Sequence, residues 1–397
     1  MDRIYASGAA GTPPSVPASP SSGYPTAGNP GAGTPATKPG PYWYHMITEE
    51  MMQVIIAAGI TPAPGTLTQL KQALDALYGS MNVYRKNAII NGNFDVWQRN
   101  TSFAITTAGS NYTADRWLAN IGTTGNNSTV SRQAFTVGQG VVPNEPTYWL
   151  RYAVTAFVSG VPSLEQRIES VRTFAGKQVT VSFLAKADAA RTVSCSLNQV
   201  FGSGGAPSAG VNSAVGTFNL TTAWQKFSGT VTLPSISGKT LGTNGDDYLQ
   251  ALFVLPGATC TIDIAQVQVE ASSSATVFEL LPPQQVLALC QRYYEKSYDV
   301  DVALGTVTAA GAHSYITPGG AGLYNQTQVY FKTTKRAVPT MTLYNSNTGA
   351  SGTWQDSSAA NNAMGSTPGR CGSSVYTTVA GGSARSFAGH WVAESEL

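Results

Sequence analysis

The chain has 397 residues, of which 42% are hydrophobic, enough apolar material for two or three packed domains. Only 11% of the residues are charged, so Thr, Ser, Asn, Gln and Gly must form most of the polar surface. The net charge of +2 argues against a nucleic-acid footprint and against a polybasic membrane patch. No stretch approaches the roughly 18 consecutive apolar residues of a membrane span, so neither nucleic acid nor a membrane is an expected partner.

The N-terminal segment differs in composition from the rest of the chain. From Ala6 to Pro41, 32 of 36 residues are Ala, Gly, Pro, Ser or Thr. Such a stretch has too little apolar area to offset the ordering cost of a globular fold, so residues 1–42 are predicted to be extended. They are either a flexible linker or an arm that becomes ordered along a partner. The arm is favoured because only five residues precede the stretch.

Residues 43–82 are predicted to form two short helices. The first carries apolar residues at helical spacing before Gly59, namely Met51, Val54, Ile55 and Ala58. Thr66 and Gln69 have the spacing of a capping box for the second helix, which Gly79 closes. That helix has a leucine seam that packs either within the chain or on further copies of it, as an oligomerisation helix: Leu67, Leu70, Leu74 and Leu77.

Residues 83–283 are predicted to form an antiparallel β-sandwich. Apolar and polar side chains alternate along 179–186 and 192–197, the period of half-buried strands. The phase of this alternation changes within 262–269, which indicates a bulge near Ala265. The sandwich core is expected to hold four tryptophans: Trp97, Trp117, Trp149 and Trp224.

A second β-rich domain, a sandwich or a small barrel, is predicted for residues 284–397. A short helix is expected at 286–294, before strands at 329–332, 340–344 and 374–379. The whole chain is thus expected to be mainly β, with an extended arm, a helical pair, a sandwich and a C-terminal β-domain. Four aromatic residues in or beside predicted loops of the last domain are the candidates for receptor contact: Tyr324, Tyr344, Trp354 and Tyr376.

The sequence carries no recognisable catalytic motif. The histidines lie in three separate segments without a zinc-protease or serine-hydrolase motif around them, and the Gly-rich runs lack the Lys-Ser/Thr of a phosphate-binding loop. Acid pairs such as Asp299 with Asp301 are more simply solvated side chains than a glycosidase pair. We therefore predict that the protein is not an enzyme and has no catalytic residues.

The four cysteines are far apart in the sequence, and no two of them form a C-x-x-C motif. This spacing argues against a zinc site and against a disulfide framework. They are predicted to be buried free thiols: Cys195, Cys260, Cys290 and Cys371. The first residues lack the basic and apolar regions of a secretory signal, so an intracellular product, or one released at lysis, is expected.

Binding functions fit the composition better than catalysis does. Aromatic residues make up 10% of the chain, with 18 Tyr and seven Trp, in a surface that is rich in amides and hydroxyls. Sugars are recognised by this combination, because their C–H faces stack on aromatic rings while amides and hydroxyls bond their hydroxyl groups. A polysaccharide is therefore a candidate partner.

Segments spread over nearly the whole chain carry a family resemblance. They are NAIINGNFDVWQR (87–99), NYTADRW (111–117), LEQRIESVRTFAGKQVTVSFLAKA (164–187), IDIAQVQVE (262–270) and ATVFELLPPQQVLALCQRYYEKS (275–297). These resemble tail fibre and tail appendage proteins of tailed bacteriophages and related prophages. The opening MDRIYASGAAGTPPS, the segment YWYHMITEEMM and the helix TLTQLKQALDAL resemble the virion-attaching end of such proteins, and HWVAESEL (390–397) resembles their C-terminal strand.

The middle region is also similar to the jelly-roll sandwiches of carbohydrate-binding modules. That resemblance implies a structural calcium ion between the first and last strands, held by Asn91, Asn93 or Asp95 together with Asp263. The alternative is that Asn91 and Asp95 only form the turn before a strand. No other cofactor is expected.

The phage resemblance implies a virion protein of the tail that is made in the host cytoplasm during assembly. Residues 1–42 would attach it to tail or baseplate proteins, the chain would form a homotrimer, and the distal β-domains would adhere to a host surface polysaccharide. Two alternatives belong to other classes. One is a depolymerase that cuts capsule or lipopolysaccharide, and the other is an architectural decoration of the head, collar or baseplate.

Overall fold

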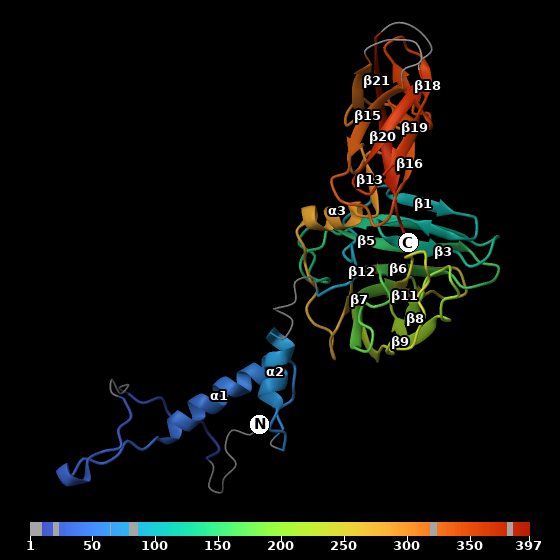
Figure 1. Cartoon of the computed structure of the whole chain (residues 1–397). Coiled ribbons are helices and arrows are strands. Elements are labelled where there is room, and N and C mark those ends of the chain that lie inside the picture. The colour runs from blue at the N-terminus through green and yellow to red at the C-terminus, as the bar shows by residue number, and fades with distance from the viewer. Residues whose placement is uncertain (1–9, 19–23, 64, 79–85, 318–323, 379–383) are drawn as a thin grey trace. The chain divides into compact units, whose positions relative to one another are not determined.

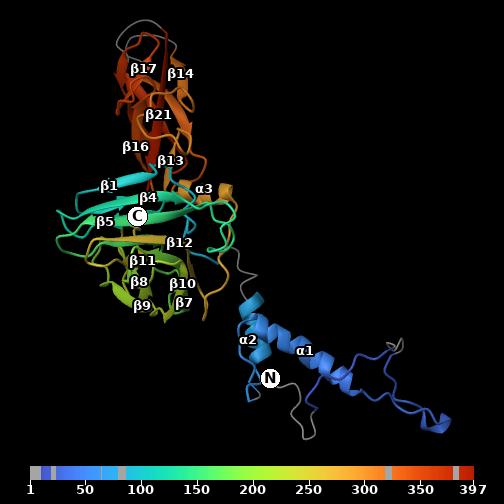
Figure 2. The same cartoon turned by 180° about the vertical axis from the view of Figure 1, so that it is seen from behind.

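The computed structural model describes residues 10–18, 24–63, 65–78, 86–317, 324–378 and 384–397 (Figures 1 and 2). The chain divides into two compact units, Met1–Tyr84 and Arg85–Leu397. All strands of the described residues lie in the second unit, and the predicted mainly β architecture is confirmed. Among these residues no helix is long and apolar enough to cross a membrane.

The described part of the arm, residues 10–18 and 24–40, is largely exposed to solvent. It is not extended throughout, because a loop closes where the Thr37 N–H donates to the Thr26 carbonyl at 2.9 Å. Within that loop lies a short 3-10 helix, η1 (Pro30–Ala32), whose first N–H groups are bonded by the side chain of Asn29. Asparagine suits this position because its side-chain oxygen accepts from the free N–H groups at a helix start.

The first predicted helix is confirmed as α1 (Pro41–Ala57). Proline fits its first position, since the missing N–H would have no partner there. Met52 and Ile55 are the buried residues of this helix. Gly59, in the left-handed region at φ +72°, follows the helix end as predicted.

The second helix, α2 (Gln69–Tyr78), packs on α1 but begins two residues later than the predicted cap at Thr66 implies. The expected capping box is wrong, because Gln69 is the first residue of the helix and not its third. The Gln69 side chain accepts from the Ala63 N–H and donates to the Thr61 carbonyl, both at 2.8 Å. The residues buried on α2 are Gln69 and Ala73, so the leucines are left half-buried or exposed: Leu67, Leu70, Leu74 and Leu77.

The second unit contains a jelly-roll sandwich of two six-stranded antiparallel sheets. Sheet I has the order β1-β4-β5-β12-β7-β10, with β1 Ser102–Ile105, β4 Asn127–Ala134, β5 Tyr148–Ala156, β12 Cys260–Glu270, β7 Gln178–Ala187 and β10 Gln225–Thr232. Sheet II has the order β2-β3-β6-β11-β8-β9, with β2 Ser110–Tyr112, β3 Trp117–Asn120, β6 Ser163–Glu169, β11 Tyr248–Val254, β8 Arg191–Val200 and β9 Val211–Leu220.

The inner faces of the two sheets form one hydrophobic core. Trp97 and Trp117 are buried in it as predicted, with Phe94 and Phe253 around the Trp117 ring. The predicted bulge is confirmed, since the register of β12 against β7 shifts between Ala265 and Gln268. The outer faces therefore carry the alternate, mainly polar residues of each strand.

The remainder of the unit is built around one long strand, β21 (Arg385–Glu394). It pairs with β13 (Tyr294–Lys296) and β14 (His313–Thr317) on one edge, and with β16 (Thr340–Asn345) and β17 (Thr353–Asp356) on the other. β17 also pairs with β18 (Asn361–Ala363). A second sheet has the order β15-β20-β19, with bounds Tyr324–Tyr330, Gly372–Thr378 and Gly365–Pro368. The short helix before these strands is α3 (Pro283–Gln291), which ends early because Tyr294 already belongs to β13.

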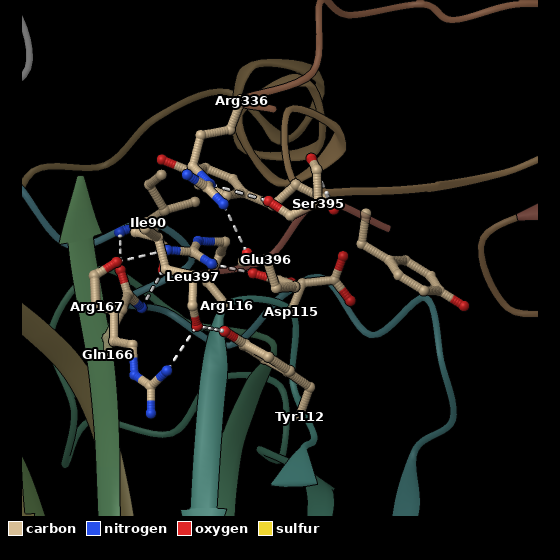
Figure 3. Close-up of polar contacts among 12 residues, drawn as sticks. Ile90, Tyr112, Asp115, Arg116, Gln166, Arg167, Arg336, Ser395, Glu396 and Leu397 are labelled. Atoms are coloured by element: carbon tan, nitrogen blue, oxygen red, sulfur yellow. Dashed lines mark hydrogen bonds and ion pairs between the residues drawn. The ribbon is translucent and has the colours of Figure 1, made fainter. Parts of the chain in front are cut away.

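A buried charged contact, here called the junction, joins the sandwich to the last residues of the chain (Figure 3). Glu396 lies between Arg116 and Arg99, and the exposed fractions of these three side chains are 6%, 1% and 11%. The Arg116 guanidinium also donates to the Arg167 carbonyl at 2.5 Å and lies 3.5 Å from the ring centre of Tyr293. The three charged side chains are therefore paired with one another in a region that solvent hardly reaches.

The main chain takes part in the same junction. The Leu397 main-chain oxygen accepts from the Tyr112 hydroxyl at 2.9 Å and from Arg167 at 2.7 Å. Arg336 donates to the main-chain oxygen of Glu396 at 3.0 Å. The sandwich and the strands around β21 are therefore held together within one compact unit.

Candidate functional site

The outer face of sheet II carries a straight row of hydrogen-bonding side chains, here called the amide row. Cross-strand pairing places Arg167 of β6 opposite Gln250 of β11, Gln250 opposite Asn198 of β8, and Asn198 opposite Asn212 of β9. Directly opposed residues project to the same face of an antiparallel sheet. Four neighbouring strands thus present one polar residue each in a single line.

Hydrogen bonds along the row fix the orientation of its amide groups. The Asn212 amide donates to the Asn198 carbonyl at 2.5 Å, and the Asn198 amide donates to the Gln250 carbonyl at 2.8 Å. The Gln250 amide then donates to the Glu165 carboxylate at 2.5 Å, which Arg167 also bonds at 3.1 Å. Since the three amide bonds all run in one direction toward Glu165, each polarises the next.

Tyr248 lies beside the row at the start of β11, and its ring is half-buried. The Arg167 guanidinium carbon is 5.1 Å from the centre of this ring. Burial raises the pKa of Tyr248, against a lowering by Arg167, so the phenol stays protonated at neutral pH. The face therefore combines an aromatic ring with amide donors and acceptors.

The chemistry of this face is that of a neutral hydrogen-bonding surface. Each amide has two N–H donors and a carbonyl with two lone pairs. Among the residues that the structure describes, the bonds along the row use one N–H of each amide. The charges of Arg167 and Glu165 offset one another. The face can therefore exchange hydrogen bonds with the hydroxyl groups of a ligand, and it presents no activated nucleophile.

The outer face of sheet I holds an aromatic cluster instead. The ring centres of Trp149 and Phe135 are 4.4 Å apart, and those of Trp149 and Trp224 are 5.9 Å apart. The Lys186 ammonium lies within 6 Å of both indole rings, 5.9 Å from Trp149 and 5.5 Å from Trp224. The prediction that Trp149 and Trp224 belong to the sandwich core is wrong, because both are half-buried in this separate cluster.

Asp263 of β12 belongs to an ion-pair group on that same outer face. Arg151 binds its two carboxylate oxygens at 2.7 and 2.9 Å, and Lys186 lies 3.6 Å away. Its side chain is only 3% exposed. Both oxygens are thus bonded by Arg151, so the described contacts of Asp263 are those of an ion pair, and its role as a calcium ligand stays a prediction.

The other predicted calcium ligands lie in the turn that precedes β1. Asn91, in the left-handed region at φ +58°, accepts the Val96 N–H at 3.0 Å and donates to the Val96 carbonyl at 2.8 Å. The alternative of turn formation therefore holds for Asn91. Asn93 donates to the Asp95 carboxylate at 3.0 Å, and burial raises the pKa of Asp95. In the part of the chain that the structure describes, no three His, Cys, Asp or Glu side chains are grouped as a metal site.

The predicted receptor aromatics do not form one exposed site. Trp354 is completely buried, with its indole N–H donating to the His390 carbonyl at 3.0 Å, so its predicted exposure is wrong. Tyr344 and Tyr376 are half-buried in β16 and β20. Tyr324 begins β15, and its side chain lies outside the described residues.

The thiol prediction holds for three of the four cysteines. Cys195, Cys260 and Cys290 are buried free thiols, whereas Cys371 is free but exposed. The prediction for Cys371 is wrong because this residue lies in the exposed turn directly before β20. Burial raises the pKa of the Cys260 thiol to about 11, so it stays protonated and unreactive.

No protein-family model matches the chain, and no curated protein matches it. Among solved structures, 47% of the chain is similar to the enzymatically active domain of bacteriophage CBA120 tailspike protein 4, at 13% identity and a TM-score of 0.28, and spans 22% of that chain. A CBM4 protein matches 46% of the chain at 23% identity and a TM-score of 0.28, over 98% of its own length. The CBM22-1 xylan-binding domain of Paenibacillus barcinonensis Xyn10C matches 45% at 14% identity and a TM-score of 0.28, over 99% of its own length. Each likeness covers less than half of this chain.

Proposed function

We propose that this protein is a structural component of a tailed bacteriophage, a tail fibre or tail appendage, which adheres to a neutral glycan of the bacterial surface. The observation that carries the proposal is the amide row, a line of three amides and an arginine across four strands with Tyr248 beside it. Amides match the paired donors and acceptors of sugar hydroxyls, and the tyrosine ring offers a stacking surface.

The row suits a polysaccharide better than a small ligand. It crosses four strands that are spaced roughly 4.8 Å apart, so it can contact successive units of an extended glycan. Its net neutrality favours an uncharged polymer over an acidic one. Single contacts of this kind are weak, so adhesion would depend on several linked copies of the protein.

The N-terminal unit supplies the attachment and the multivalency in this proposal. Its opening sequence resembles the virion-attaching end of tail appendages, and residues 1–42 would dock to tail or baseplate proteins. In the described residues of α2 and the turn before it, Leu67 is 97% exposed and Leu74 is 43% exposed. A second and third copy of the chain would cover these leucines, giving a homotrimer.

Glycan binding is tested with the full chain on an array of bacterial surface polysaccharides. Asn198→Ala and Gln250→Ala should each weaken binding to the polysaccharide that the unaltered protein retains. Gln225→Ala is the matched control, because Gln225 is an exposed amide on β10 of the other sheet. Equal binding by all three variants would remove the amide row as the contact surface.

Placement on the particle is tested separately. Antibody labelling of purified virions should mark the tail, and sedimentation of the full chain should give the mass of three copies. Labelling on the head or collar would favour the decoration alternative, and a monomer would remove the proposed homotrimer.

The proposal assigns no catalysis to the chain. The depolymerase alternative predicts new reducing ends when the protein is incubated with the polysaccharide that it binds. We expect none, because the amide row contains no activated nucleophile or exposed carboxylate pair. Release of oligosaccharides would overturn this part of the proposal.

A further inference from the structure

A pocket of about 250 Å³, here called the end pocket, adjoins the amide row at β6. Arg167 and Glu169, which share the outer face of sheet II at the end of β6, both line it. Their cross-strand neighbours on β11 are Gln250 of the row and Tyr248 beside the row. The end pocket therefore lies next to the face that we propose to bind glycan.

The far wall of the end pocket comes from outside sheet II. In the described part of the chain, β3 pairs only with the first four residues of β6, so the last three have no strand on that side. α3 and the segment 88–90 take this place. Figure 3 shows Ile90 beside Gln166, whose side-chain amide accepts from the Ile90 N–H at 2.7 Å and donates to the Ile90 carbonyl at 2.8 Å. These bonds to β6 fix the wall in position.

Beyond β6, the line of the amide row leads into the junction. Next to Arg167 lies Arg116, whose guanidinium donates to the Arg167 carbonyl at 2.5 Å. Arg116 is only 1% exposed, since Glu396 and the Tyr293 ring cover it. A glycan that follows the row from β9 to β6 therefore cannot continue past β6, and its last unit stops at the end pocket.

The end pocket has an aliphatic side and a polar side. The aliphatic side chains come from α3, β6 and the segment 88–90: Leu289, Ile168, Ala88 and Ile90. The polar side chains are all half-buried, so that side is open to solvent: Arg167, Glu169, Thr173 and Arg292. A sugar unit can bury C–H groups against the aliphatic side while its hydroxyl groups bond the polar side.

The Glu169 carboxylate is an acceptor that the end pocket offers to a hydroxyl group. Arg292 holds its two oxygens at 2.6 and 2.8 Å, and the Tyr293 hydroxyl donates to it at 2.9 Å. Burial raises the pKa of Glu169, but the hydrogen bonds from Arg292 and Tyr293 outweigh this effect and lower it, so the carboxylate is ionised at neutral pH. A carboxylate has about four lone-pair sites, so these bonds leave room for a ligand hydroxyl.

The charges around the end pocket are paired. Arg292 forms an ion pair with Glu169, and Arg167 forms one with Glu165. The lining therefore favours a neutral sugar over an acidic or a basic one. Its volume lies below the roughly 300–1,000 Å³ of drug-sized sites, which suits one sugar unit rather than several.

The geometry points to recognition of chain ends: the end pocket holds the terminal unit of a neutral glycan whose preceding units lie along the amide row. The hydroxyl groups of that unit bond Glu169 and Thr173, and its C–H groups pack on Leu289 and Ile90. This inference rests on the proposed glycan binding and adds that the protein binds the ends of the polymer rather than its interior.

The test measures how much protein binds to a given mass of glycan. The probes are the neutral lipopolysaccharide O-chains of the array, each used intact and after partial acid hydrolysis, and the full chain is titrated by calorimetry. Hydrolysis multiplies the chain ends at constant sugar mass. The protein bound per gram should therefore rise by the same factor as the number of ends. An unchanged amount per gram would show that interior units are bound and would overturn the inference.

Two substitutions fill the end pocket from different elements, Thr173→Trp from the turn after β6 and Leu289→Trp from α3. Each should weaken binding to the shortened chains at least about tenfold, the factor that 1.4 kcal/mol produces. Thr232→Trp is the matched control at an exposed position of β10, and it should bind like the unaltered protein. Melting temperatures show which variants are folded. A folded variant with a filled pocket and full affinity would overturn the end pocket.

The same measurements separate the end pocket from the amide row. Asn198→Ala and Gln250→Ala should weaken binding to intact and to shortened chains, since the row contacts the preceding units. Full binding by both variants, or no binding on the array, would overturn the proposed function and this inference with it. Weakened binding by both variants, together with a constant amount of protein per gram, would overturn the end pocket alone.

Discussion

The junction and the amide row are neighbouring polar regions of sheet II that use opposite chemistry. Arg116 and Glu396 of the junction are charged, paired and almost fully buried. Asn198 and Gln250 of the row are neutral amides that stay half-exposed. Arg167 belongs to both, since it bonds the Leu397 oxygen on one side and Glu165 on the other.

The difference shows where this protein uses its few charges. Buried charges must be paired, because the loss of one partner leaves the other charge buried and uncompensated, which lowers stability. Such a contact is suited to holding two parts of a unit in fixed positions. Neutral amides exchange hydrogen bonds with water at little cost, so they are suited to a surface that binds and releases a ligand. The following substitutions test this division.

The largest effect is expected from Arg116→Met. Removing this arginine leaves the buried Glu396 carboxylate with Arg99 as its remaining ionic partner and also removes the contact with the Tyr293 ring. The free energy of unfolding should fall by about 3–5 kcal/mol, measured by urea denaturation. Arg191→Met is the control, because Arg191 forms a more exposed pair with Asp188 and should change stability little. An equal loss of unfolding free energy in both variants would show that the buried junction stabilises the fold no more than an exposed ion pair does.

Asp115 should make the junction sensitive to pH. It accepts the main-chain N–H of Gln98 at 2.8 Å, and its carboxyl is buried. Burial raises its pKa to about 6, against a lowering by Arg99 and Gln98. The folded state therefore holds the proton more tightly than the unfolded state, whose pKa is about 3.9. This contribution is fully present below about pH 4 and is lost as the pH rises through about 6.

The corresponding measurement compares the unaltered protein with Asp115→Asn by urea unfolding at pH 4 and pH 7. The free-energy difference between the two should shift by about 2 kcal/mol in favour of the variant as the pH rises from 4 to 7. Parallel stability curves across this range would mean that Asp115 does not titrate as its burial implies.

A substitution in the amide row should change glycan affinity more than it changes the free energy of unfolding. Asn198→Ala should reduce glycan affinity about tenfold, which corresponds to the 1.4 kcal/mol of one or two hydrogen bonds. Its effect on the free energy of unfolding should be about 1 kcal/mol or less, since the site is half-exposed. Titration on a biosensor surface and urea denaturation give the two numbers. A large loss of stability with unchanged affinity would assign this row a structural role.

The smallest effect is a difference in thiol labelling. Cys371 is exposed, whereas Cys290 lies in a buried cluster with Ile90 and Val96 next to the junction. A maleimide should label native protein at Cys371 first, as peptide mass spectrometry can show. Labelling of Cys290 requires local opening, so Arg116→Met should accelerate it. Unchanged protection of Cys290 in that variant would show that the junction does not control this opening.

Local sequence patterns were sufficient for much of the fold. Alternation along 179–186 and 192–197 predicted β7 and β8, because successive side chains of a strand point to opposite faces. The predicted single buried face holds for β8, whereas β7 is buried on both faces. The phase change predicted the bulge after Ala265 for the same reason. The proline- and glycine-rich arm lacks a hydrophobic core because its own side chains supply almost no apolar area.

The candidate site could be predicted only as a composition, rich in amides and aromatic rings. The row itself depends on register, which brings Asn198 beside Gln250 although 51 intervening residues separate them in the chain. Nothing in a single strand specifies its partner, since pairing follows from the packing of both sheets on one core.

The sequence by itself determined the class of each segment, since the period of its hydrophobic residues is a local property. Tertiary structure decided which side chains are accessible. Trp354 was expected at the surface but is buried, because Gly389 on the adjacent strand lacks a side chain and leaves room for the indole. The exposed row and the buried junction likewise arise from the way that distant strands meet, because burial is a property of neighbours in space.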